Sequence, residues 1–318
     1  MSAEPRILPA NTREEWLQER KAGIGCSEIA AILGLNPWRS PLDVYLDKIG
    51  EGRPQEETRP MRLGKAFEPA ILAEYTKETG REARLNDRLF QHPDVPMLGT
   101  PDAFELEELP PPGVEMKATR NQNGWGESGT DEIPDVYLPQ VAGYMAILNR
   151  PFWHVAALIA GGDFRVYTVR RDAALEAVIL ENVARFWRDN VIAHRAPDPD
   201  GSASAGEWVR EKFPRHTSMA RVASPEESDL LRLLVEAKDG REAAEREEER
   251  LKQLVQMRIG DAEGLIFDGG KCTWKTSKDS VVTDWKAVAA ELTVPVEVVN
   301  KHTNLRPGSR RFVLTVKE

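Results

Sequence analysis

Apolar positions in the first 200 residues recur at two spacings, one typical of helices and one typical of strands. Helices are predicted over 28–33, 41–49, 65–79, 136–148 and 173–192. The first two follow serines, and the first three end at a glycine, as helices commonly do. Ser27 is therefore the predicted N-cap of the first helix.

Short stretches of alternating or continuous apolar residues lie between these helices. Strands are predicted over 84–90, 97–100, 103–106, 114–118, 155–159 and 165–169. The last two flank a Gly161-Gly162 turn and form a predicted hairpin. The order of elements predicts an α/β (α+β) fold in which helices flank a mixed β-sheet.

A stretch rich in Pro, Gly, Ser and Ala, over 196–206, predicts a linker and divides the chain into 1–200 and 201–318. Beyond it, Ser224-Pro225-Glu226-Glu227 has the pattern of a capping box. The helix that it opens is predicted to run over about 225–259, long enough to be an exposed arm. A hairpin over 265–274, a helix around 284–292 and a strand over 311–316 complete a small predicted α+β unit.

Composition narrows the possible classes of protein. Two cysteines, Cys26 and Cys272, are too few for a disulfide framework or a four-cysteine metal site. No apolar run approaches about 20 residues and no signal pattern opens the chain, so we expect a cytoplasmic protein with no membrane association. The net charge of −9 argues against non-specific attraction to nucleic acid. Only residues 271–318 are basic, with nine Lys and Arg against five Asp and Glu.

Candidate chemistry is concentrated in two predicted strands. Glu115 and Lys117 alternate on one strand and so point to the same face, and Asp102 directly precedes the strand before it. Two carboxylates with a lysine suit Mg²⁺ or Mn²⁺, and the backbone carbonyl of Met116 is a further candidate ligand. Such a site would activate water against a phosphodiester. An E-x-K stretch alone is also common on solvated strand faces.

Several motifs in family order make residues 13–195 resemble the YqaJ-like viral recombinase / phage lambda exonuclease family of the PD-(D/E)XK nuclease superfamily. They are the stretches 20–30 and 35–41, Leu63-Gly64-Lys65-Ala66-Phe67-Glu68-Pro69, Thr100-Pro101-Asp102, Glu115-Met116-Lys117 and 137–141. The family's usual Gly-Ser-Asp stands here as Cys26-Ser27-Glu28. The resemblance implies a restriction-endonuclease-like core, with residues 201–318 as a C-terminal extension.

The resemblance also implies roles for individual residues. Asp102 and Glu115 would bind metal, and Lys117 would act on the nucleophile. Glu68 would be a supplementary carboxylate, and Gln140 would position water or the scissile phosphate. The residues implied in DNA or 5′-phosphate binding are Arg20, Ser27, Thr100, Trp38 and Arg39. Free N–H groups at the start of the helix after Ser27 would favour such an anion.

The implied activity is Mg²⁺-dependent 5′-to-3′ digestion of double-stranded DNA ends, which leaves 3′ single-stranded tails for phage-type recombination. The family implies a ring-shaped homotrimer and a single-strand annealing protein as partner, in a bacterial or phage-infected cell. The residues alone leave two alternative functions open. One is an endonuclease or repair nuclease of the same fold, and the other is a non-catalytic DNA-end-binding or recombinase-loading module.

Overall fold

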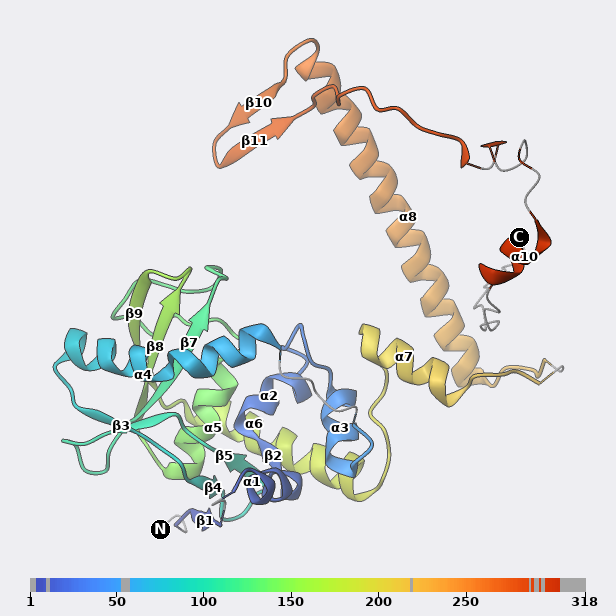
Figure 1. Cartoon of the computed structure of the whole chain (residues 1–318). Coiled ribbons are helices and arrows are strands. Elements are labelled where there is room, and N and C mark those ends of the chain that lie inside the picture. The colour runs from blue at the N-terminus through green and yellow to red at the C-terminus, as the bar shows by residue number, and fades with distance from the viewer. Residues whose placement is uncertain are drawn as a thin grey trace. The chain divides into compact units, whose positions relative to one another are not determined.

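The computed structural model describes residues 4–9, 12–52, 58–217, 220–285, 287–288, 292 and 295–303. The chain forms two compact units, Met1–Phe213 and Pro214–Glu318 (Figure 1). The first unit extends past residue 200, because helix α7 (Ala203–Lys212) packs against the first core through Ala205. Part of the predicted linker is therefore helical.

A five-stranded mixed sheet forms the centre of the first unit. Its strands are β3 (Ala83–Leu85), β6 (Ala103–Glu105), β7 (Gly113–Thr119), β8 (Phe152–Ile159) and β9 (Asp163–Arg170), in that order. Strands β7 and β8 are parallel, with Glu115 opposite Val155, and the other pairs are antiparallel. The α5 crossover between β7 and β8 makes this parallel pair possible.

A second, smaller sheet lies beside the first. It has the order β1 (Arg6–Leu8), β4 (Leu89–Gln91), β5 (Met97–Gly99) and β2 (Ile24–Gly25). Only β2 and β5 pair in parallel. The predicted mixed α+β class with helices flanking the sheets is confirmed, although the strands divide between two sheets.

Helices cover both faces of the five-stranded sheet (Figure 1). On one face, α4 (Arg59–Thr79) packs Ile71, Leu72 and Tyr75 against Val114 and other apolar residues of the sheet. Alternate residues of the strands point to the opposite face and join the core that includes α5 (Leu138–Leu148) and α6 (Ala173–Phe186). A π-helix over Trp187–Ile192 continues α6. The alternation of β7 thus turns Val114 and Met116 toward α4, and Glu115 and Lys117 away from it.

The remaining N-terminal helices are short. They are α1 (Arg13–Glu19), a 3₁₀ turn over Arg20–Ala22, α2 (Cys26–Ile32) and α3 (Pro41–Ile49). The predicted helix over 41–49 is confirmed. The helix predicted over 65–79 starts earlier, because Thr58 caps it by accepting from Met61 N.

The prediction of one strand over 84–90 was wrong. Asn86 breaks it, because its side chain accepts from Arg88 N at 3.1 Å and donates to Pro101 O at 3.0 Å. The turn sends β3 to one sheet and β4 to the other.

The second unit contains few buried residues among those described. Helix α8 spans Pro225–Ile259, the range that the sequence predicts, with Ser224 as its N-cap. A hairpin of β10 (Gly264–Phe267) and β11 (Gly270–Thr273) follows, and α10 covers Val296–Lys301. The strand predicted over 311–316 lies outside the described residues, and so do residues 286 and 289–291 of the helix predicted around 284–292.

None of the helices within the described ranges is both long enough and apolar enough to cross a membrane.

A buried polar cluster lies on the α4 side of the sheet. His154 is 2 % exposed, and its Nε2 accepts from Arg81 Nη1 at 2.6 Å, while its Nδ1 is 3.0 Å from Thr168 Oγ1. Glu105 Oε1 is farther from Nε2, at 3.4 Å, so the ring serves as a neutral acceptor for Arg81. Burial, together with the charge of Arg81, lowers the pKa of His154 to about 4. His154 is thus a core residue.

We predict that His154 makes folding pH-dependent between its unfolded pKa near 6.5 and about 4. Because the pKa of His154 is lower in the folded protein than in the unfolded chain, its contribution to the free energy of unfolding is complete above pH 6.5. That contribution is lost as the pH falls toward 4, and the free energy of unfolding should fall by about 3 kcal/mol. Urea unfolding of the wild type and His154→Asn across this range measures it. Parallel pH profiles for the two proteins would contradict the prediction.

Candidate functional site

Glu115 and Lys117 lie side by side on β7, on the face turned away from α4. Lys117 Nζ contacts Glu115 Oε1 and also donates to Gln140 Oε1 at 3.1 Å. Gln140 Nε2, on α5, donates to the same Glu115 oxygen at 2.8 Å. The three predicted residues therefore form one hydrogen-bonded group.

Asp102 joins this group from the residue before β6. Its Oδ2 accepts from Met116 N at 2.7 Å, which ties the carboxylate to the middle of β7. Burial raises the pKa of Asp102 well above its usual range, and neighbouring Glu115 raises it further. Burial lowers the pKa of Lys117, but Glu115 and Asp102 outweigh it and raise that pKa overall. The carboxylates of Asp102 and Glu115 thus share the positive charge of Lys117 at a position with little solvent.

Tyr144 connects this group to Thr100, although no motif pointed to it. Its hydroxyl accepts from Gln140 Nε2 at 2.9 Å and donates to Thr100 O at 3.2 Å. A Cβ at Gly99 would come within 2.9 Å of the Tyr144 ring, so glycine is needed for this close approach. The spacing of four residues from Gln140, on the same helix face, was the available signal.

One oxygen of the site has no partner. Glu115 is 1 % exposed, yet its Oε2 makes no hydrogen bond within the described structure. An unpaired buried carboxylate oxygen is costly unless a cation binds it. Glu68, half-buried on α4, adds negative charge nearby: burial raises the pKa of Glu68 and Glu115 raises it further, while Lys65 and Lys117 oppose the rise.

This donor set fits a hard divalent cation. Across the described ranges, no three His, Cys, Asp or Glu side chains are grouped so as to hold a metal ion by themselves. A cation here would rest on Asp102 and Glu115, with water and main-chain oxygen completing its shell. Mg²⁺ is bound in this way in many proteins. The role of the Met116 carbonyl stays a prediction; its amide is the donor to Asp102.

A second charged cluster surrounds Glu28, which is 2 % exposed. Arg20 Nη2 and Arg39 Nη1 lie 3.2 and 3.4 Å from its Oε1, and Lys48 Nζ lies 2.7 Å from its Oε2. Burial opposes ionisation, but Lys48, Arg20 and Arg39 together lower the pKa of Glu28. The sequence alone indicates no role for Glu28 or Lys48, because nothing in their spacing shows that they meet.

The structure links Arg20 to Thr100. The Arg20 guanidinium lies over the Trp16 ring at 4.7 Å, and Trp16 Nε1 donates to Thr100 Oγ1 at 3.3 Å. Since Thr100 O also accepts from Tyr144, a chain of contacts joins the Glu28 cluster to Gln140 and Glu115.

The prediction that Ser27 caps a helix was wrong. Gly25 is the N-cap of α2, and Ser27 is an exposed residue in its first turn. The reason is Glu28, whose Oε2 accepts from Gly25 N at 2.7 Å. The N–H group of the actual N-cap residue, Gly25, is therefore occupied by this carboxylate.

Trp38 and Arg39, both implied in DNA binding, differ in how free their side chains are to contact a ligand. Trp38 is 71 % exposed, on a turn in which Asn36 Oδ1 accepts from the backbone N–H groups of residues 38 and 39. Arg39 is instead engaged by Glu28 and Asp47. Its position favours a role in holding α3 over direct contact with DNA.

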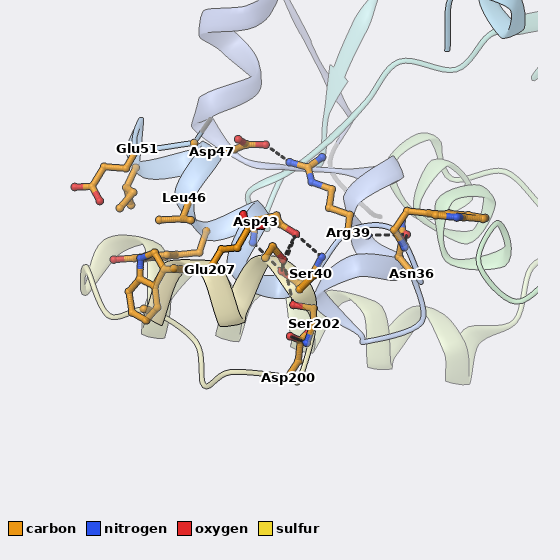
Figure 2. Close-up of a pocket in the computed structure, with 18 of the residues that line it drawn as sticks. Asn36, Arg39, Ser40, Asp43, Leu46, Asp47, Glu51, Asp200, Ser202 and Glu207 are labelled. Carbon is orange, nitrogen blue, oxygen red and sulfur yellow. Dashed lines mark hydrogen bonds and ion pairs between the residues drawn. The ribbon is translucent and has the colours of Figure 1, made fainter. Parts of the chain in front are cut away.

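A cavity of about 1240 Å³ lies where α3 meets α7, with Trp38 and Arg39 in its lining (Figure 2). Asp43 Oδ2 accepts there from Ser40 Oγ at 2.7 Å and from Ser204 Oγ at 3.0 Å. These bonds fasten α7 to α3. The lining does not include Asp102, Glu115 or Lys117, so the cavity is separate from the carboxylate site.

Part of this chain is similar to a known family of domains. Residues 15–151 match the YqaJ-like viral recombinase domain, and this range includes all the site residues named above except those of α7. The uncharacterized protein YqaJ of Bacillus subtilis (strain 168) is 26 % identical over 315 residues, which cover 96 % of this chain and 97 % of that protein. The match to YqaJ therefore extends well beyond the YqaJ-like domain.

Two solved structures are also similar at low identity. An alkaline exonuclease (LHK-Exo) from Laribacter hongkongensis is 19 % identical with a TM-score of 0.46, and the match covers 63 % of this chain and 98 % of that chain. A phage related exonuclease from Haemophilus somnus 129PT is 11 % identical with a TM-score of 0.41, over 56 % and 99 % of the two chains.

We predict that Asp102→Asn stabilises the metal-free protein by about 1 kcal/mol, because it removes repulsion between two buried carboxylates. Asparagine can still accept from Met116 N. Urea unfolding in EDTA measures the change, with exposed Asp87→Asn as the matched control, expected to change stability by less than about 0.5 kcal/mol. A clear loss of stability in Asp102→Asn would contradict this account of the site.

Proposed function

We propose that this chain is a metal-dependent exonuclease that digests double-stranded DNA from 5′ to 3′ and leaves 3′ single-stranded tails. The observation that carries the proposal is the buried Glu115 carboxylate, which has one oxygen held by Lys117 and Gln140 and the other unpaired beside Asp102. The match to a viral recombinase domain supports a role in DNA recombination.

Asp102 and Glu115 would hold Mg²⁺ or Mn²⁺. The bound cation supplies polarisation of a phosphate oxygen and activation of water. Lys117 adds a fixed positive charge beside the attacked phosphate, and Gln140 orients water or a phosphate oxygen through its amide. Glu68 would contribute a further carboxylate to water in the cation's shell.

The cluster around Arg20 would bind the 5′-terminal phosphate. Three cations, Arg20, Arg39 and Lys48, surround Glu28, and Arg20 remains 27 % exposed. Thr100 reaches Arg20 through Trp16, and Ser27 offers an exposed hydroxyl in the first turn of α2, next to Glu28 in the chain. Exposed Trp38 could stack against a base.

We further expect a ring-shaped homotrimer around the DNA and a single-strand annealing protein as partner, in the cytoplasm of a bacterial or phage-infected cell. A protein that encircles its substrate needs less overall positive charge to remain bound. The net charge of −9 is compatible with such a mode of binding.

We predict that the protein digests linear duplex DNA in Mg²⁺, releases label from the 5′ end first, and leaves a covalently closed circle intact. Lys117→Ala and Asp102→Ala should each lower the rate by about 10³-fold or more, because each removes a charge from the reacting centre. Lys77→Ala is the matched control, since that lysine is exposed on α4 and pairs only locally with Glu74.

Three results would contradict the proposal. Cleavage of the closed circle would favour an endonuclease or repair nuclease of the same fold. DNA-end binding without any Mg²⁺-dependent product would favour a non-catalytic loading module. Near-normal digestion by either site variant would refute the assignment of the residues.

A further inference from the structure

Glu28 has an unusual number of charged contacts for a buried carboxylate. Its Oε1 faces two guanidinium groups and its Oε2 accepts from Lys48 Nζ and Gly25 N, both at 2.7 Å. A single N-cap contact does not require so many cations. The arrangement instead fixes where each cation lies.

These cations differ in what else holds them: the side chains of Arg20 and Arg39 are 27 % and 22 % exposed, but Arg20 contacts one carboxylate and Arg39 contacts two. Lys48 is 3 % exposed, and its Nζ also donates to Arg20 O at 2.9 Å, so it holds the backbone of residue 20. Arg39 is held between Glu28 and Asp47. Arg20 directs Nη2 at Glu28, stacks on Trp16 and remains partly open to solvent.

The space around this guanidinium is restricted. A Cβ at Gly25 would come within 3.2 Å of Arg20 Nη2 and 3.3 Å of Glu28 Oε2. The guanidinium is therefore fixed by a carboxylate, an aromatic ring and a close main-chain wall. A planar fork held in this way can present its remaining donors to an anion in one orientation.

We propose that Glu28 is a positioning residue that orients Arg20 for the 5′-terminal phosphate of DNA. The inference rests on the proposed 5′-phosphate pocket. Glu28 does not itself touch the phosphate, which as an anion it would repel. Glu28 acts by holding the Arg20 guanidinium in one orientation, while Lys48 neutralises the second oxygen of the Glu28 carboxylate.

A positioning role and a simple charge effect predict opposite changes in the affinity of Glu28→Gln for a 5′-phosphorylated DNA end. Removing the carboxylate makes the cluster more positive, so charge alone would bind a 5′-phosphorylated end more tightly. Orientation predicts the reverse, because Arg20 loses its charged partner and samples other rotamers. The ratio of affinities for 5′-phosphorylated and 5′-hydroxyl ends separates the two.

The experiment measures that ratio by fluorescence anisotropy, using the full chain and a short duplex with either end, in EDTA so that the DNA stays intact. We expect Arg20→Ala to lower the ratio about tenfold or more, the effect of losing a charge-assisted hydrogen bond. Glu28→Gln should lower it similarly, and the double variant no further, because both act through one contact. Asp47→Asn is the matched control, since it touches Arg39 and should keep the wild-type ratio.

A wild-type or higher ratio in Glu28→Gln, or additive losses in the double variant, would overturn the positioning role. If Glu28→Gln does not fold cooperatively, Glu28→Asp decides, because it keeps the charge but shortens the reach. A ratio at least threefold below wild type then supports the proposal, and an unchanged ratio overturns it. Equal affinity of the wild type for both ends would refute the phosphate pocket and this inference together, whereas failure of the nuclease proposal alone would appear as absent digestion with the ratio intact.

Discussion

The buried carboxylate of Glu115 is the constraint on which the rest of the site depends. Its first oxygen is held by Lys117 and Gln140, and its second has no partner in the described structure. Such an arrangement lowers the stability of the metal-free protein and leaves a place for a divalent cation. The sheet tolerates this cost because β7 is a central strand, paired on both sides and packed by α4 on its other face.

The Glu28 cluster, built from N-terminal residues of the chain, is connected to the Glu115 site. Trp16 links Arg20 to the Thr100 side chain, and Tyr144 links the Thr100 main chain to Gln140, so a series of contacts connects a partly exposed guanidinium to the carboxylate site. Residues separated by more than 80 positions in the chain are thereby held in one rigid group. The proposed function needs such a fixed relation, because the recognised phosphate and the cleaved bond would have to be held at a set distance from each other.

The sequence predicted the parts of the site that depend on local geometry. Strand alternation placed Glu115 and Lys117 on one face, and the helical pattern placed Gln140 on α5. It missed Glu28 with Lys48, and Tyr144 with Thr100, because these contacts join segments whose proximity only the fold determines. The wrong N-cap at Ser27 and the unbroken strand over 84–90 have a shared cause. In each, a polar side chain, that of Glu28 or Asn86, bonds to nearby main chain and overrides the simple pattern.

Mn²⁺ binding shows whether Glu115 and Asp102 hold a divalent cation. Electron paramagnetic resonance reports free Mn²⁺ during titration of the DNA-free protein. We expect the wild type to remove the free-ion signal, whereas Glu115→Gln, which keeps the size of the side chain but not its charge, should leave it unchanged. Equal Mn²⁺ binding by the two proteins, or none by the wild type, would contradict this expectation.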